Sequence, residues 1–232
     1  MKTKIVNRRT LLHSAGLLAG GLLVGAGSAH GATRLSAPPA RPATPDEAWA
    51  TLKEGNRRWV ADAAIHPHQD RARRDEVAEK QNPYAVVVSC IDSRVPPEIV
   101  FDAGIGDVFT VRSAAQTIDP LVSGAIEYGP VELATPLIVV MGHQRCGAVT
   151  AAAHALREGT TLPGDLQRIV EALRPAYDRA HGDVDKMIRI NTVDTVAKLK
   201  ADKLLAPRIA RKQLKIVGSY YSLDTGQVTR LV

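Results

Sequence analysis

Five side chains that can bind or assist a metal ion follow two short apolar runs of the chain. They are Cys90, Asp92 and Arg94, after the run 86–89, and His143 and Cys146, after the run 137–141. These positions use both cysteines of the sequence. Thiolate and imidazole groups suit Zn²⁺, and four ligands complete its tetrahedron. The sequence therefore predicts a zinc site made of Cys90, His143 and Cys146, with Asp92 as a candidate fourth ligand.

The fourth position decides what such a site does. Asp92 and Arg94 flank Ser93 and share one side of an extended segment, so that the guanidinium can hold the carboxylate. If Asp92 pairs with Arg94, the metal keeps a position for water, as catalytic zinc sites do, and can supply hydroxide at neutral pH. If Asp92 binds the metal permanently, the site is structural. An ordinary surface ion pair is the third interpretation of the two charges.

A disulfide between Cys90 and Cys146 is the alternative to a metal site. It would suit an exported protein, because oxidising compartments favour disulfides. His143, three residues before Cys146, and Asp92, two residues after Cys90, favour the metal, because a disulfide needs neither of them.

Length and charge limit the classes of function. The 232 residues, 45% of them hydrophobic, are enough for one domain with a buried core. Four of the six excess positive charges lie in residues 1–31, which leaves a net charge of +2 for the rest. Aromatic residues make up only 4% of the chain, and no basic stripe contains them, so we expect no nucleic-acid partner.

Residues 1–31 have the layout of an export signal. A basic start with the twin arginine Arg8 and Arg9 precedes an apolar run over 17–24 and small residues up to Gly31, which is typical of the bacterial twin-arginine signal. We therefore expect an exported protein, periplasmic or extracellular. The alternative is an uncleaved membrane anchor, but glycines interrupt the run, which is too short for a span of about 20 residues. We expect no stable membrane span after cleavage.

A proline- and alanine-rich leader over residues 32–43 precedes the predicted folded domain, residues 44–232. The domain begins with a helix that Thr44 or Asp46 caps. Short Val- and Ile-rich runs then alternate with helical patterns. The predicted strands are 85–89, 107–111, 137–141, 215–219 and 228–231, and the predicted helices include 122–133, 149–157, 166–181 and 185–203. This alternation predicts an α/β fold with a mainly parallel central sheet flanked by helices.

The candidate ligands lie where such a fold places functional sites. Strands of an open parallel sheet present functional groups at their carboxyl ends, and both ligand groups follow predicted strands. The spacing of three residues between His143 and Cys146 suggests one helical turn. Two separate strand ends are therefore expected to converge on one metal ion.

Two motifs of the chain match the β-class carbonic anhydrases. Residues 90–94, Cys-Ile-Asp-Ser-Arg, match the CxDSR motif, and residues 143–147, His-Gln-Arg-Cys-Gly, match the HxxCG motif of that family. The surrounding segments 52–59, 106–112, 126–128 and 216–226 also resemble the family. The chain resembles these enzymes over residues 44–232, which implies their fold with an extended amino-terminal helix.

The resemblance implies the reversible hydration of carbon dioxide to bicarbonate and a proton by a zinc-bound hydroxide. Cys90, His143 and Cys146 would bind Zn²⁺, while Asp92 and Arg94 would form the dyad that orients the hydroxide. It also implies that the following two residues contribute to the substrate pocket: Gln81 and Gly147. The family forms dimers, so a homodimer or a dimer of dimers is expected.

Two departures from the family pattern leave alternatives open. Residues 113–116 read Ser-Ala-Ala-Gln where the family usually has Asn-Ala-Gly-Asn, a change that affects the expected wall of the pocket. Val87 stands where bicarbonate-inhibited members have tryptophan, so that regulatory site is not expected. Related enzymes of this fold hydrolyse carbonyl sulfide or carbon disulfide. A non-catalytic zinc protein, with Asp92 as fixed fourth ligand, is the remaining alternative.

Overall fold

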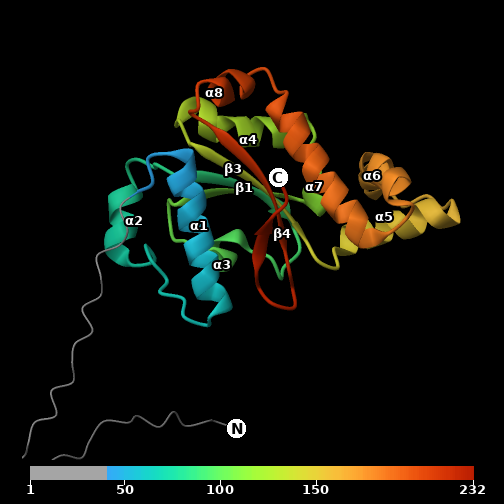
Figure 1. Cartoon of the computed structure of the whole chain (residues 1–232), viewed down its shortest axis with the longest axis horizontal. Coiled ribbons are helices and arrows are strands. Elements are labelled where there is room, and N and C mark those ends of the chain that lie inside the picture. Colours follow the sequence, from blue (N-terminus) through green and yellow to red (C-terminus); the bar gives the residue numbers. More distant parts are fainter. Residues whose placement is uncertain (1–40) are drawn as a thin grey trace, which may run out of the picture. The chain divides into compact units, whose positions relative to one another are not determined.

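The structure, a computed structural model, describes residues 41–232. The predicted export signal over 1–31 and residues 32–40 of the predicted leader lie outside this part. Its centre is a five-stranded sheet in the order β2-β1-β3-β4-β5 (Figure 1). The strands are β1 (Ala85–Cys90), β2 (Val108–Ser113), β3 (Leu137–His143), β4 (Lys215–Tyr221) and β5 (Val228–Arg230).

Helices lie on both sides of this sheet (Figure 1). They are α1 (Pro45–Val60), α2 (Arg71–Val77), α3 (Pro97–Val100), α4 (Pro120–Glu132), α5 (Gly147–Glu158), α6 (Leu166–Ala180), α7 (Val184–Lys200) and α8 (Ala206–Ala210), with a short 3₁₀ helix η1 (Ala114–Gln116). Strands β2, β1, β3 and β4 are parallel, and only β5 runs antiparallel, beside β4. The predicted α/β fold with a mainly parallel sheet is therefore confirmed.

The four parallel strands end later than predicted, whereas β5 ends one residue earlier, at Arg230. β1 includes Cys90, and β3 continues to His143, which pairs with Tyr221 of β4. In β1 and β3 the extension reaches Cys90 and His143, candidate ligands that the sequence predicts to follow the strands. Two of the three candidate ligands therefore lie on the sheet itself.

Alternate residues of the buried strands pack into two separate layers. Val87 and Val139 belong to the layer that contains Leu52 of α1. Val86 belongs to the other layer, together with Ile126 of α4. Helices on both faces explain why β1 and β3 are continuous apolar runs rather than alternating ones. This double cover fixes the strands whose carboxyl ends hold the candidate site.

Helix α1 begins at the predicted cap. The Thr44 Oγ1 accepts a hydrogen bond from the N–H of Glu47 at 3.2 Å, and the Glu47 carboxylate accepts one from the N–H of Thr44 at 3.1 Å. This reciprocal capping box satisfies N–H groups that the first helical turn leaves free. Pro45 follows as the first helical residue, where a missing N–H costs nothing.

Asn56 fastens α1 to the turn between β4 and β5. Its amide donates to the carbonyl oxygens of Val100 at 3.0 Å and Gly226 at 2.8 Å, and its Oδ1 accepts from the N–H of Val228 at 2.8 Å. Asn56 is buried, so its loss would leave these backbone groups without partners.

We therefore expect Asn56→Ala to lower the free energy of unfolding by about 2–3 kcal/mol. Urea denaturation of the purified protein measures this change. Lys53→Ala is the control, because Lys53 is exposed on the same helix and its replacement should change stability by less than about 0.5 kcal/mol. Equal stability of the two variants would contradict the anchoring role of Asn56.

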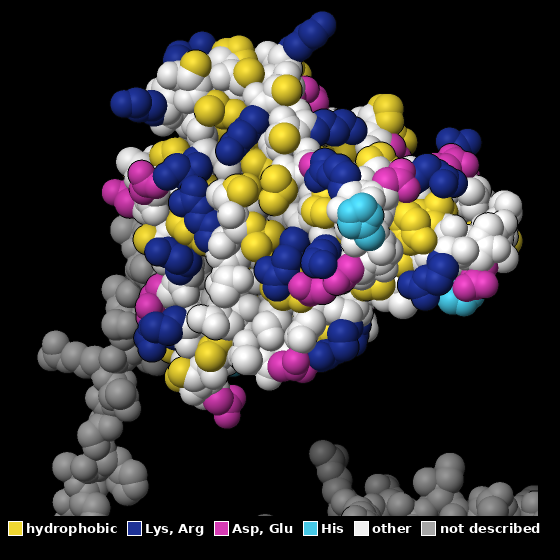
Figure 2. Space-filling view, turned by 45° about the vertical axis from the view of Figure 1, so that its right-hand side comes forward, with side chains coloured by type: hydrophobic (Ala, Val, Ile, Leu, Met, Phe, Trp, Pro, Cys, Tyr) yellow, Lys and Arg dark blue, Asp and Glu magenta, His cyan; other side chains and the backbone are white. Residues whose placement is uncertain are grey.

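The surface of the described residues mixes charged and apolar side chains. On the face drawn in Figure 2, Lys and Arg lie beside Asp and Glu, with hydrophobic side chains between them. Every helix of residues 41–232 falls short of the length and apolar character that crossing a membrane requires.

Candidate metal centre

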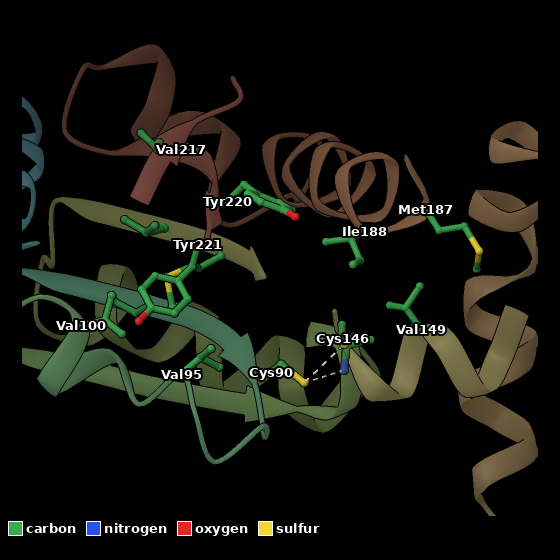
Figure 3. Packing of buried hydrophobic residues seen from close by; sticks show 14 of the residues in the cluster. Cys90, Val95, Val100, Cys146, Val149, Met187, Ile188, Val217, Tyr220 and Tyr221 are labelled. Atoms are coloured by element: carbon green, nitrogen blue, oxygen red, sulfur yellow. Dashed lines mark hydrogen bonds between the residues drawn. The ribbon is translucent and has the colours of Figure 1, made fainter. Parts of the chain in front are cut away.

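Cys90, His143 and Cys146 meet at the carboxyl ends of β1 and β3. Their candidate ligand atoms all lie within 4.8 Å of one another, and no other group of this kind occurs in residues 41–232. All three side chains are buried. Figure 3 shows Cys90 and Cys146 at this end of the sheet, with Tyr220 and Tyr221 of β4 nearby in the same buried cluster.

The two cysteines are free thiols. Their Sγ atoms are 3.8 Å apart, whereas a disulfide joins sulfurs at about 2.05 Å. The separation suits two sulfur ligands around a common ion rather than a bond between them.

The helical turn predicted for His143 and Cys146 is wrong. His143 is the last residue of β3, and Cys146 is the N-cap of α5. The intervening turn contains Arg145 with φ of 50°, in the left-handed region that a non-glycine residue enters at a cost of about 1 kcal/mol. A tight strand-to-helix turn, rather than a helical face, brings the two ligands together.

His143 presents one nitrogen that has no protein partner. Its Nδ1 lies 3.0 Å from the carbonyl oxygen of Gln144, which makes Nδ1 the protonated nitrogen and leaves the lone pair on Nε2. Nε2 is buried and lacks any hydrogen-bond partner. An unsatisfied buried nitrogen beside two thiols is costly without an ion, so these residues fit a thiophilic metal.

The surroundings of Cys90 favour its thiolate. The contact with Cys146 lowers the pKa of Cys90 to about 4, and the neighbouring His143 and the N–H groups of Asp92 and Ala115 act in the same direction, against the effect of burial. The Ala115 N–H donates to Sγ at 3.3 Å. Cys90 is therefore ready to act as an anionic ligand at neutral pH.

The pKa of Cys146 shifts in the opposite direction from that of Cys90. Contact with Cys90 and burial raise the pKa of Cys146, although the N–H groups of Val149 and Ala148 favour its thiolate. Two adjacent thiolates repel each other, so the second proton is held firmly unless a cation occupies the space between them.

Asp92 and Arg94 form the predicted pair. Arg94 Nε donates to Asp92 Oδ1 at 2.9 Å and Nη2 donates to Oδ2 at 2.7 Å, a two-point contact. This contact is the main cause that lowers the pKa of Asp92 to about 2, so the carboxylate is ionised at neutral pH. Its Oδ2 lies 3.9 Å from His143 Nε2. Asp92 is thus held by Arg94 next to the cluster.

Arg112 fixes the backbone that carries Cys90 and Asp92. Its Nε donates to the carbonyl oxygen of Cys90 at 2.8 Å, and its Nη2 donates to that of Asp92 at 2.6 Å. The side chain comes from β2, the strand beside β1. The sequence placed Arg112 only within a segment resembling the family, and nothing in the local pattern predicted these contacts.

The altered segment 113–116 touches the cluster directly. Ala115 and Gln116 are buried with φ of 53° and 46°. Asn191 of α7 donates to the carbonyl oxygen of Ala115 at 2.9 Å, and Gln116 donates to Thr192 Oγ1 at 3.1 Å. These contacts hold the strained backbone so that the Ala115 N–H faces Cys90. No local pattern of the sequence predicts that α7 supports this segment.

Gln81 and Gly147 lie in different places. Gly147 is the first residue of α5, next to Cys146, and an added Cβ there would meet nothing within 4 Å. Gln81 is exposed in the segment before β1. Because β1 has six residues at about 3.3 Å each, Gln81 and Cys90 lie at opposite ends of a strand about 20 Å long. The chain brings Gly147 to the cluster, but not Gln81.

A parallel α/β sheet with a buried Cys/His/Cys cluster at its carboxyl edge defines the class of protein. A family model described as carbonic anhydrase matches residues 85–228. Carbonic anhydrase 2 of Mycobacterium tuberculosis is 44% identical over 188 residues, covering 79% of this chain and 91% of that protein. The chain therefore belongs to the β-class carbonic anhydrase family.

Solved structures of the family share this fold. A β-carbonic anhydrase from Coccomyxa, in complex with acetazolamide, is 27% identical with a TM-score of 0.61 and covers 77% of this chain and 83% of that chain. One of two tetrameric β-carbonic anhydrases of Sordaria macrospora is 22% identical with a TM-score of 0.64, covering 79% and 96%. The comparisons lend no support to the carbonyl sulfide, carbon disulfide or non-catalytic alternatives.

Proposed function

We propose that this chain catalyses the reversible hydration of carbon dioxide to bicarbonate and a proton, with Zn²⁺ held by Cys90, His143 and Cys146. The observation that carries the proposal is the pairing of Asp92 with Arg94 beside a buried Cys/His/Cys cluster. Three protein ligands and a carboxylate held elsewhere are what an open, catalytic site requires. Family membership supports the same activity.

Zinc is the metal that this donor set suits best. Two thiolates with one imidazole favour Zn²⁺ over the harder Mg²⁺ and Ca²⁺, which prefer oxygen ligands. When bound, Zn²⁺ would lower the pKa of a coordinated water and so provide a nucleophile at neutral pH. The protein would hold the ion through Cys90, His143 and Cys146 and would orient the coordinated water through Asp92.

Asp92 and Arg94 have separate tasks in this proposal. Asp92 is ionised, so its Oδ2 would accept a hydrogen bond from a water at the metal position and set the direction of that water's lone pair. Arg94 keeps the carboxylate from moving toward His143 Nε2, 3.9 Å away. Gly147, at the start of α5, offers a backbone N–H to a substrate oxygen, where a helix amino terminus favours negative charge.

Stopped-flow measurement of carbon dioxide hydration tests the proposal. The zinc-loaded protein, assayed from about pH 6.5 to 9, should accelerate hydration, and metal analysis should give about one Zn²⁺ per chain. Absence of activity over the whole range would refute it. Purified protein with no bound zinc and no free thiols would instead restore the disulfide interpretation.

A second copy of the chain is expected at the edge of the sheet. β2 has β1 on one side only, and Ile91 and Ile99, in the segment that follows β1, are 60% and 53% exposed. An open edge with apolar side chains beside it favours association. Gln81 lies far from the metal centre of its own chain, so a second copy of the chain would have to supply this residue if the pocket contains it. Light scattering should find a dimer or a dimer of dimers, and a particle of one chain's mass would contradict this.

We also propose export of the folded domain 44–232. The twin arginine Arg8 and Arg9, the apolar run and the small residues up to Gly31 support a removable signal, followed by the leader 32–43. Replacing both arginines by lysine in the full chain should retain the protein inside bacterial cells. Unchanged export of this variant would contradict a twin-arginine route.

A further inference from the structure

The position of Arg94 depends on more than Asp92. Its side chain is 51% exposed, and its Nη2 donates to the carbonyl oxygen of Arg145 at 3.2 Å as well as to Asp92. The two-point contact fixes the guanidinium relative to Asp92, and the third acceptor fixes the Asp92–Arg94 pair relative to the rest of the site. That acceptor belongs to the turn between His143 and Cys146.

The same turn is hydrogen-bonded to the loop that joins β4 and β5. Asp224 of this loop accepts hydrogen bonds from Arg145 at 3.1 and 2.6 Å and from Gln144 at 2.8 Å. Gln144 Oε1 in turn lies 3.3 Å from two donors, the Ser222 hydroxyl and the N–H of Asp224. Both residues of the turn are therefore tied to one carboxylate.

This loop is itself rigidly placed. Gly226 has φ of 71°, and a Cβ there would lie 2.9 Å from the Trp59 indole nitrogen, so the loop packs against α1. Asn56, also on α1, binds the Gly226 carbonyl oxygen from a buried position. Contacts with α1 therefore hold the loop in place, and with it Asp224, which binds the turn.

We propose that Asp224 is a positioning residue for the Asp92–Arg94 pair. By holding Arg145 in its left-handed conformation, it keeps the Arg145 carbonyl oxygen in line with Arg94 Nη2, and Arg94 then keeps Asp92 away from the metal position. The inference rests on the proposed function only in taking that position to hold a metal ion.

The Arg145–Asp224 pair gains little stability by itself. Its side chains are 55% and 57% exposed, and ion pairs of such exposure contribute little to the free energy of unfolding. Losing this pair should therefore change the melting temperature little. If Asp224 positions Arg94, its loss should instead increase the fraction of molecules in which Asp92 binds the metal. The chain also provides a control: Arg179 and Asp194 form an ion pair of similar exposure, 55% and 40%, between α6 and α7, in which both guanidinium nitrogens donate to Asp194 Oδ1.

The test uses protein loaded with Co²⁺, whose visible absorption reports the ligands around the ion, and azide as a probe of an open metal position. In Asp224→Asn, azide binding should weaken about threefold or more, and the spectrum should shift toward that of Arg94→Ala, in which Asp92 is released. Asp194→Asn should match the wild type in both measurements.

Three outcomes would overturn the proposal. Asp224→Asn could leave azide binding and the spectrum unchanged while Arg94→Ala alters both. Asp194→Asn could produce the same changes as Asp224→Asn. Asp224→Asn could also lower the melting temperature far more than Asp194→Asn, which would identify a structural role. Failure of the wild-type protein to bind Co²⁺ or Zn²⁺ would instead refute the proposed function.

Discussion

Cys146→Ser is expected to abolish metal binding and to reduce carbon dioxide hydration by at least about 100-fold. Cys146 contributes one of the two sulfurs, which lie 3.8 Å apart. A serine hydroxyl remains protonated at neutral pH and is a poor ligand for Zn²⁺, so the ion would be left with two strong protein ligands. Metal analysis after dialysis should fall from about one Zn²⁺ per chain to less than about 0.1.

The fold should survive this substitution. Cys146 is the N-cap of α5, and no side-chain hydrogen bond caps the helix there. Serine is a preferred N-cap residue, so the helix start should be at least as stable as before. Circular dichroism can therefore separate loss of metal from loss of structure.

Ser89→Ala is the matched control for Cys146→Ser. Ser89 is buried next to Cys90, and its hydroxyl has no hydrogen-bond partner. Removing an unsatisfied hydroxyl costs little, so this variant should keep its zinc and its activity. Zinc retention by Cys146→Ser, or equal zinc loss in both variants, would contradict the assignment of Cys146 as a ligand.

The strands and the three candidate ligands could be predicted because their signals are local. Apolar runs such as 137–141 define strands, and Cys90, His143 and Cys146 lie within a few residues of strand ends. The conformation between His143 and Cys146 could not, because a spacing of three residues suits a helical turn as well as a tight turn with a left-handed residue. The extension of β3 to His143, which pairs with Tyr221, decided between them.

The contacts that hold the site in place could not be predicted from local sequence patterns, because they join residues far apart in the chain. Asn191 meets Ala115 across 76 positions, and Arg145 meets Asp224 across 79. Only the packing of α7 and of the β4–β5 loop against the sheet creates these contacts. The distance of Gln81 from the cluster, in contrast, follows from strand length alone: a residue nine positions before Cys90 lies at the other end of β1.

Arg94→Ala should reduce hydration activity by about 100-fold near pH 7 and by a smaller factor near pH 9. Without the guanidinium, Asp92 loses both of its side-chain donors and keeps only the backbone N–H of residue 94, which lies 3.0 Å from Oδ1, so its Oδ2, 3.9 Å from His143 Nε2, can move onto the metal position. There it competes with water and hydroxide for the ion. Because the hydroxide concentration rises with pH, the competition shifts against Asp92 in alkaline solution, and part of the activity should return.

The titration of Asp92 itself does not produce this pH dependence. Arg94 lowers the pKa of Asp92 to about 2, and removing Arg94 should return it toward its ordinary value of about 3.9. The carboxylate is ionised between pH 6.5 and 9 in both proteins. The stabilisation from the pair is complete above the unfolded pKa and disappears only as pH falls through the folded value, far below the assay range.

Two further variants separate the release of Asp92 from a general loss of charge. Arg57→Ala breaks another two-point pair, with Glu54 on α1, whose side chains are 66% and 51% exposed, and it should leave the pH profile unchanged. Arg94→Ala combined with Asp92→Asn removes the competing carboxylate. Azide binding to the Co²⁺-loaded double variant should then recover relative to Arg94→Ala, although hydration stays slow because no carboxylate orients the water. If azide binding stays weak in the double variant, Arg94 acts by a route other than restraining Asp92.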